Sequence, residues 1–99
     1  MIRHIVTWKL MAEDAAEKAA AFDQLAAGFG PLPGLIPEVR SLTLGRDVDE
    51  TSGNWDVVLL IDFENTADLE TYQGHPEHEK VKSIVRSLTR ERSAIDFEF

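Results

Sequence analysis

The stretch that decides the fold is Trp55-Asp56-Val57-Val58-Leu59-Leu60-Ile61-Asp62-Phe63. Every odd-numbered position in it is apolar, which is the period of two expected for a β-strand with a buried face. Val58 and Leu60 make the opposite face apolar as well. A strand of this kind has two faces to bury, so the sheet that contains it needs a cover on both sides.

Three further strands are predicted around this one, over residues 2–10, 39–46 and 93–99. The first strand places on one face Ile2, His4, Val6 and Trp8. The last strand places on one side Ile95, Phe97 and Phe99. These alternating patterns are typical of strands in an antiparallel sheet.

Helical periodicity separates the strands. Residues 12–29 predict a helix with a buried stripe of Ala15, Ala19, Phe22, Ala26 and Phe29. Glycines and prolines then predict a loop up to Pro37. A short helix should start at Asn65 or Thr66 and run through Tyr72. The helix over residues 76–89 should bury the stripe of Val81, Ile84, Val85 and Leu88.

The resulting order is strand, helix, strand, strand, two helices, strand. This order predicts an α+β fold, the ferredoxin-like four-stranded antiparallel sheet with helices on one face. One helix layer leaves the other apolar face bare, and a second copy of the same sheet is the simplest cover for it. We therefore expect a homodimer, a dimeric α/β barrel, that pairs through its sheet faces.

The break between the last two helices falls in Tyr72-Gln73-Gly74-His75-Pro76-Glu77-His78. Gly74 can take the left-handed conformation that ends a helix, and Pro76 suits the first position of the next one. His75 precedes a proline and is pushed out of the helical region. We expect Tyr72, His75 and His78 to meet around this corner, with His78 on the inward face of its helix.

Composition limits the classes of function. The 99 residues suit one domain over residues 1–99, and ten basic against eighteen acidic residues give a net charge of −8. Such a charge repels nucleic acid and anionic membranes, so neither is an expected partner. The sequence holds no cysteine and no apolar run of membrane-spanning length, and we expect a cytoplasmic protein.

Several motifs together resemble the stress-responsive α/β-barrel domain family, often called Dabb, of the dimeric α/β-barrel superfamily. The motifs are His4-Ile5-Val6, Pro33-Gly34, Asp62-Phe63-Glu64, Tyr72-x-x-His75-Pro76-x-His78 and Ile95-Asp96-Phe97. The resemblance covers essentially the whole chain, and it implies a ferredoxin-like subunit, a dimer and a ligand-sized cavity in each subunit.

The resemblance also implies possible site residues. In a plant branch of polyketide cyclases, a histidine and a tyrosine matching His78 and Tyr72 perform acid–base chemistry. A first-strand histidine like His4 lines the same pocket. That branch places a further histidine on the third strand, where this sequence reads Asp56-Val57-Val58. Because of this departure, the resemblance does not imply the specific cyclisation of that branch.

We assign catalytic roles to His78, Tyr72 and His4. A neutral imidazole at His78 can remove a proton next to a carbonyl, while the Tyr72 phenol donates a hydrogen bond to the developing oxyanion. The residues expected to bind substrate are Val6, Trp8, Val57, Leu59 and His75. The structural alternatives are a His78 bonded to a backbone carbonyl, a Tyr72 packed at the core edge, and a His4 or Trp8 that only fills the core. For His75 the position before Pro76 favours the structural alternative, a side chain that locks the corner by bonding backbone.

No metal site is expected, because Pro76 places His75 outside the helix that carries His78. No organic cofactor is expected either. We interpret the chain as a dimeric protein that binds a small aromatic or carbonyl compound in an apolar cavity. If it is an enzyme, it should be a cofactor-independent cyclase, isomerase or lyase. The alternatives are a non-catalytic dimeric stress or structural protein and a cofactor-free monooxygenase.

Overall fold

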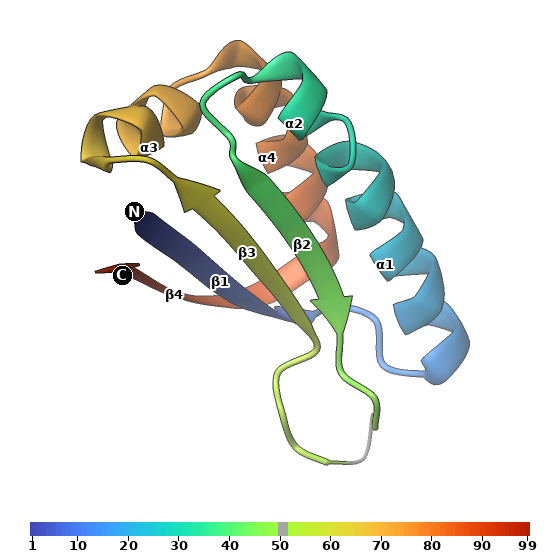
Figure 1. Cartoon of the computed structure of the whole chain (residues 1–99). Coiled ribbons are helices and arrows are strands. Elements are labelled where there is room, and N and C mark those ends of the chain that lie inside the picture. The colour runs from blue at the N-terminus through green and yellow to red at the C-terminus, as the bar shows by residue number, and fades with distance from the viewer. Residues whose placement is uncertain (50–51) are drawn as a thin grey trace.

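A computed structural model describes residues 1–49 and 52–99 of the chain. The elements in chain order are β1 (Ile2–Leu10), α1 (Ala15–Phe29), α2 (Leu32–Leu35), β2 (Ser41–Arg46), β3 (Val57–Phe63), α3 (Thr66–Gln73), α4 (Pro76–Leu88) and β4 (Thr89–Glu98). The strands form one antiparallel sheet in the order β2-β3-β1-β4. Figure 1 shows helices α1 and α4 along one face of this sheet and the two chain ends close together. The predicted ferredoxin-like plan is confirmed.

Strand β1 lies in the middle of the sheet and sets the positions of its neighbours. Its register pairs His4 with Ile61 of β3 on one side and with Asp96 of β4 on the other. Further along, Trp8 lies opposite Val57 and Arg92. Directly opposite residues point to the same face, so β1 and β4 present His4, Asp96, Trp8 and Arg92 toward the helices.

The core lies between the sheet and the helix layer. Its largest fully buried side chains are Tyr72, Phe29, Phe63, Leu10, Leu25, Leu32, Ile36, Leu59, Ile61 and Val6. The odd positions of β3 point into this core, as their period of two predicts. The helix-facing side of β1 is buried for the same reason, and His4 is its one polar member at 5% exposure.

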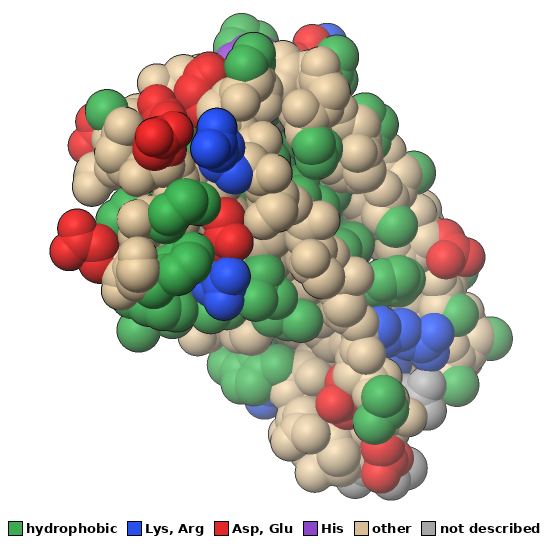
Figure 2. All heavy atoms as spheres, viewed as in Figure 1, with side chains coloured by type: hydrophobic (Ala, Val, Ile, Leu, Met, Phe, Trp, Pro, Cys, Tyr) green, Lys and Arg blue, Asp and Glu red, His purple; other side chains and the backbone are tan. Residues whose placement is uncertain are grey.

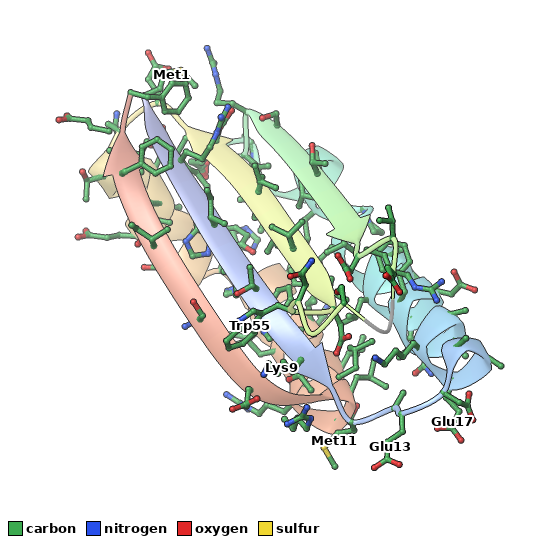
Figure 3. The ribbon with its side chains drawn as sticks, turned by 90° about the horizontal axis from the view of Figure 1, so that it is seen from below. Met1, Lys9, Met11, Glu13, Glu17 and Trp55 are labelled. Atoms are coloured by element: carbon green, nitrogen blue, oxygen red, sulfur yellow. The ribbon has the colours of Figure 1, made fainter. Side chains whose placement is uncertain are left out.

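The other sheet face has no helix over it in Figure 3, and we call it the open face. Its apolar residues are Ile5, Val58, Leu60, Ile95 and Phe97. Ile95 is 61% exposed and Phe97 is 40% exposed. Figure 2 shows hydrophobic side chains gathered over the end of the sheet where the two termini lie. The two-sided apolar pattern of β3 therefore leaves one apolar face open in the single subunit, as predicted.

Four local predictions need correction. The loop predicted after α1 contains a helical turn, α2, because Pro31 has helical backbone angles and Pro33 lies in the first turn, where a proline is tolerated. The last strand begins at Thr89, directly after α4, and not at residue 93. Helix α1 begins at Ala15, and its buried residues are Ala21, Leu25 and Phe29. Ala15 is exposed, and not part of the buried stripe as predicted. Alanines on every side of this helix make its buried face hard to recognise from periodicity alone.

The fourth correction concerns the corner. Gly74 ends α3 with φ −94° and ψ 0°, in the right-handed region and not the left-handed one. The chain passes at once into α4, and the amide N–H groups of Gly74 and His75 still reach the carbonyls of Glu70 and Tyr72. His75 is extended at φ −71° and ψ 138°, as expected before a proline.

No helix in the described part of the chain is long and apolar enough to cross a membrane. The cytoplasmic location stays a prediction.

Candidate functional site

A cavity of about 340 Å³ lies between α4 and the helix-facing side of the sheet. It is lined by His4, Val6, Trp8, Phe29, Leu59, Tyr72, Gln73, His78, Val81, Lys82, Val85, Arg86 and Arg92. The volume falls within the range of small-molecule sites. The three predicted catalytic residues, His78, Tyr72 and His4, all line it, although they come from three different elements.

Tyr72 lies in the last turn of α3, and its side chain is fully buried. Its ring stacks at a tilt on His78, with the ring centroids 4.3 Å apart, and lies edge-on to His4 at 6.2 Å. The hydroxyl has no hydrogen-bond partner among the described residues. Burial raises the pKa of the Tyr72 phenol far above its usual value, against the opposing effect of the Arg92 charge. The phenol therefore stays protonated, and the residue lines the cavity with a hydrogen-bond donor that no described residue uses.

His78 lies in the first turn of α4, on the helix face that contains Val81 and Val85. Its Nδ1 lies 3.2 Å from the Gln73 carbonyl oxygen. A carbonyl can only accept, so Nδ1 carries the proton and Nε2 is left with a lone pair. Burial is the main reason that the pKa of His78 lies below its ordinary value. The neutral ring with a basic Nε2 is the form suited to removing a proton near neutral pH.

The His4 ring is held by a carboxylate of the edge strand β4. Its Nδ1 lies 2.5 Å from Oδ1 of Asp96, which faces it across the β1–β4 ladder. The carboxylate accepts from Nδ1 and fixes the ring orientation beside Tyr72. Asp96 was not among the predicted site residues. The alternation of β4 places it opposite in direction to Ile95 and Phe97, but its pairing with His4 depends on a register that local sequence does not reveal.

The apolar wall of the cavity comes from the sheet and α1. Three of the predicted substrate-binding residues, Val6, Trp8 and Leu59, line it. Phe29 joins them and packs at a tilt against Trp8, with the ring centroids 5.8 Å apart. The Trp8 Nε1 atom is buried and meets no acceptor in the described part of the chain. Trp8 thus adds a second unpartnered donor to the residues that line the cavity.

The other two predicted substrate-binding residues lie elsewhere. Val57 is buried in the core and does not line this cavity. His75 does not line it either, because its side chain caps α4: Nδ1 accepts from the Glu77 amide at 3.1 Å. His75 therefore locks the corner, which is the structural alternative considered for it.

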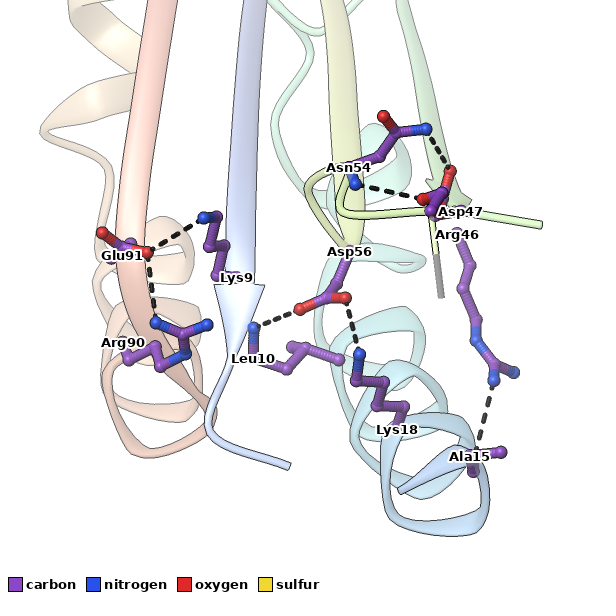
Figure 4. A network of polar contacts seen from close by, with 11 residues as sticks. Lys9, Leu10, Ala15, Lys18, Arg46, Asp47, Asn54, Asp56, Arg90 and Glu91 are labelled. Carbon is purple, nitrogen blue, oxygen red and sulfur yellow. Dashed lines mark hydrogen bonds and ion pairs between the residues drawn. The ribbon is translucent and has the colours of Figure 1, made fainter. Parts of the chain in front are cut away.

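Asp56, the first residue of the stretch Asp56-Val57-Val58, has a structural role here. Figure 4 shows the Asp56 carboxylate accepting from the Leu10 amide at 2.8 Å and from Lys18 Nζ at 3.0 Å. Burial works against ionisation of Asp56, but these two hydrogen bonds and the Lys18 charge outweigh it and hold its pKa below the usual value. Asp56 joins the ends of β1 and β3 to α1, away from the cavity.

Three cationic side chains of the cavity were missed by the sequence analysis. Lys82 and Arg86 follow His78 at intervals of four residues along α4, and Arg92 comes from β4. The spacing of four was visible in the sequence and puts the first two on the face of His78. The contribution of Arg92 could be found only from the packing of β4 beside β1.

Within residues 1–49 and 52–99, no three His, Cys, Asp or Glu side chains are grouped so that they could hold a metal ion. That the protein has no metal site stays a prediction.

The model of the stress-responsive A/B barrel domain family matches residues 2–99. The chain belongs to this family. The predicted resemblance to Dabb proteins is thereby confirmed over nearly the whole chain. No protein among the curated ones matches the sequence.

Solved structures of similar proteins agree with the fold. A dimeric protein of unknown function with a ferredoxin-like fold from Bacteroides fragilis is 27% identical, with a TM-score of 0.88 over 99% of this chain and 95% of that one. A dimeric ferredoxin-like protein from Thermobifida fusca is 26% identical, with a TM-score of 0.83 over 99% and 90%. The hydroxynitrile lyase from Passiflora edulis shares the fold at 17% identity, with a TM-score of 0.78 over 97% and 90%.

Replacing Tyr72 by Phe tests the unpartnered hydroxyl. Burying a hydroxyl without a partner costs free energy, so we expect Tyr72→Phe to leave the free energy of unfolding unchanged or to raise it by up to about 2 kcal/mol. Thr89→Val is the matched control, because the Thr89 hydroxyl donates to the Val85 carbonyl at 2.8 Å. The control should lose about 1 kcal/mol in urea unfolding. A Tyr72→Phe protein that loses as much as the control would show that the hydroxyl is bonded.

The lowered pKa of His78 predicts a pH dependence of stability. Between about pH 6.5 and the lower folded-state pKa, the unfolded chain binds a proton at His78 that the folded protein does not. The free energy of unfolding should therefore fall as the pH drops through this window, and His78→Asn should remove that part of the fall. Urea unfolding at pH 7.5 and pH 5 measures it. Equal losses in wild type and variant would contradict the assignment.

Proposed function

We propose that the protein binds a small aromatic or carbonyl compound in this cavity and moves a proton on it. His78 Nε2 acts as the general base at a carbon next to a carbonyl, and the Tyr72 hydroxyl donates to the oxyanion that forms. The observation that carries the proposal is the pairing of a neutral His78 with a stacked Tyr72 whose hydroxyl has no described partner. Preorganised donors of this kind stabilise developing charge without having to reorganise.

The two side chains divide the work according to their protonation. Nδ1 of His78 is committed to the Gln73 carbonyl at 3.2 Å, so only Nε2 is available to accept a proton. Tyr72 is kept neutral by burial, so its hydroxyl keeps the hydrogen that it donates. His4, oriented by Asp96, lies edge-on to Tyr72 and positions the phenol. This pair needs no organic cofactor for enolisation, so the reaction class is a cofactor-independent isomerase, cyclase or lyase.

The apolar lining supports binding of a compound with an apolar body. Val6, Leu59 and Phe29 form a hydrophobic wall on the side of the sheet and α1. Burying apolar ligand surface there contributes roughly 25 cal/mol per Å². The alternative with a cavity filled by its own side chains is disfavoured by the 340 Å³ of space. A dimer that binds a ligand without catalysis is the second candidate.

Deuterium exchange of 2-tetralone, an aromatic ketone with acidic α-protons, tests the chemistry directly. Wild-type protein in D₂O should accelerate exchange at the α-carbon, followed by proton NMR. His78→Asn should lower the protein-dependent rate by about 10²–10⁴-fold, and Tyr72→Phe by about a hundredfold. The matched control is His75→Asn, since asparagine can still cap α4 and residue 75 lies outside the cavity.

Each result separates the candidates. Binding of 2-tetralone without accelerated exchange favours the non-catalytic dimer. Oxygen uptake with this probe, which proton exchange does not require, would favour the cofactor-free monooxygenase. If His75→Asn also lost exchange, the rate would depend on the intact corner between α3 and α4, and it would give no evidence for His78 as the base.

The assembly we propose is a homodimer whose open faces pack together. The apolar open face is the support within this chain, and the dimeric relatives from Bacteroides fragilis and Thermobifida fusca are the support outside it. Two such faces in contact would remove Ile95 and Phe97 from water. Arg3, which pairs with Asp62 at 2.8 Å and lies over the Phe99 ring, would sit at the edge of the contact.

Light scattering at micromolar concentration should give twice the subunit mass of 11.1 kDa. Ile95→Lys should give the monomer, because a lysine on the paired faces would be buried without a partner. Leu35→Lys, on α2 at 49% exposure, is the control and should stay dimeric. A monomeric wild type would overturn the assembly.

A further inference from the structure

The charges around the cavity are opposite in sign to those of the whole chain. The protein has eighteen acidic and ten basic residues. Yet the charged side chains that line the cavity are Lys82, Arg86 and Arg92, and no Asp or Glu of the described residues lines it. An acidic protein that concentrates positive charge at one cavity creates a local field that attracts anions.

Two of these cations are also unusual in having no partner. Elsewhere the basic side chains are engaged, for example Lys18 with Asp56 and Arg40 with Glu64. Lys82 pairs with Glu79 at 2.8 Å. Arg86 and Arg92 make no hydrogen bond or ion pair with any residue in the described ranges. The two arginines of the cavity therefore have their donors available for a ligand.

A third donor lies at the same end of the cavity. Arg92 lies directly opposite Trp8 in the β1–β4 ladder. Trp8 is 97% buried, being 3% exposed, and its indole N–H has no acceptor among the residues described. Leaving a buried donor unpaired costs free energy, so a ligand oxygen that accepts from it would recover that cost. Trp8, Arg86 and Arg92 together form what we call the cationic end.

Arg86 is separated from His78 along α4, whereas the Arg92 charge still acts on Tyr72. Arg86 lies eight residues after His78 on the same helix face, which is about 12 Å along the helix axis. Val81 and Val85 line the cavity between them. Arginine guanidinium groups bind carboxylates through paired hydrogen bonds, which gives orientation as well as affinity. An anion at Arg86 and Arg92 would thus direct the rest of the ligand toward Tyr72 and His78.

We propose that the ligand is a carboxylate-bearing compound with an apolar body, and that Arg86, Arg92 and the Trp8 indole N–H bind its carboxylate. This inference rests on the proposed function, because it names the class of compound that the same cavity accepts. The apolar body lies on Phe29, Val81 and Val85, and the reacting carbonyl lies at Tyr72 and His78.

The test compares 2-naphthylacetate with 2-naphthylacetamide, in which a neutral amide replaces the carboxylate, by isothermal titration calorimetry at pH 7.5 and low salt. Wild type should bind the carboxylate about tenfold or more tightly than the amide, as expected for charge-assisted hydrogen bonds. Arg86→Gln and Arg92→Gln should each reduce this preference, and the double variant should abolish it. Added salt should weaken carboxylate binding only.

Arg90→Gln is the matched control, since Arg90 lies on β4 but pairs with Glu91 and does not line the cavity. It should keep the full preference. Equal affinities for the two ligands in wild type, unchanged in the double variant, would overturn the anion site and leave binding and proton exchange at His78 standing. Binding of neither ligand would overturn the anion site together with the cavity as a binding site. A carboxylate preference without His78-dependent exchange would uphold the anion site and overturn the acid–base proposal.

Discussion

The cavity depends on the interruption of the helix between Gln73 and Pro76. Pro76 has no amide hydrogen and His75 is extended before it, so α3 and α4 cannot continue as one rod. The His75 ring then caps the new helix by accepting from the Glu77 amide. This corner directs α4 along the helix-covered face of the sheet and places His78 against the ring of Tyr72. Without it, neither the stacked pair nor the space beside it would form.

The polar groups around that space are organised more for a ligand than for the fold. Buried donors are nearly always paired in folded proteins, but Tyr72 and Trp8 keep unpaired donors among the described residues. By contrast, Asp56 accepts from the Leu10 amide and from Lys18, and so connects β1, the start of β3 and α1. Stability that could have been gained by apolar residues at positions 8 and 72 is given up in the cavity, which is typical of functional sites.

The two apolar sides of β3 serve different purposes on the two faces of the sheet. The odd positions of β3 fill the core under the helices, and Leu59 reaches the cavity wall. The even positions, Val58 and Leu60, belong to an apolar surface continued by Ile95 and Phe97. One helix layer can cover only one of these surfaces, so the ligand site and the assembly surface lie on opposite sides of one sheet.

The sequence by itself determined the element order, the ferredoxin-like plan, the broken helix at His75-Pro76, and the presence of His78, Tyr72 and His4 on inward faces. Periods of two and of about four reveal which residues share a face, because they arise within one element. Only the tertiary structure decided that Asp96 holds His4, that Arg92 and Trp8 meet at one end, and that Val57 and His75 stay outside the cavity. Those facts depend on the register between strands and on the placement of α4 against the sheet, which are set by packing between distant segments and leave no local pattern in the chain.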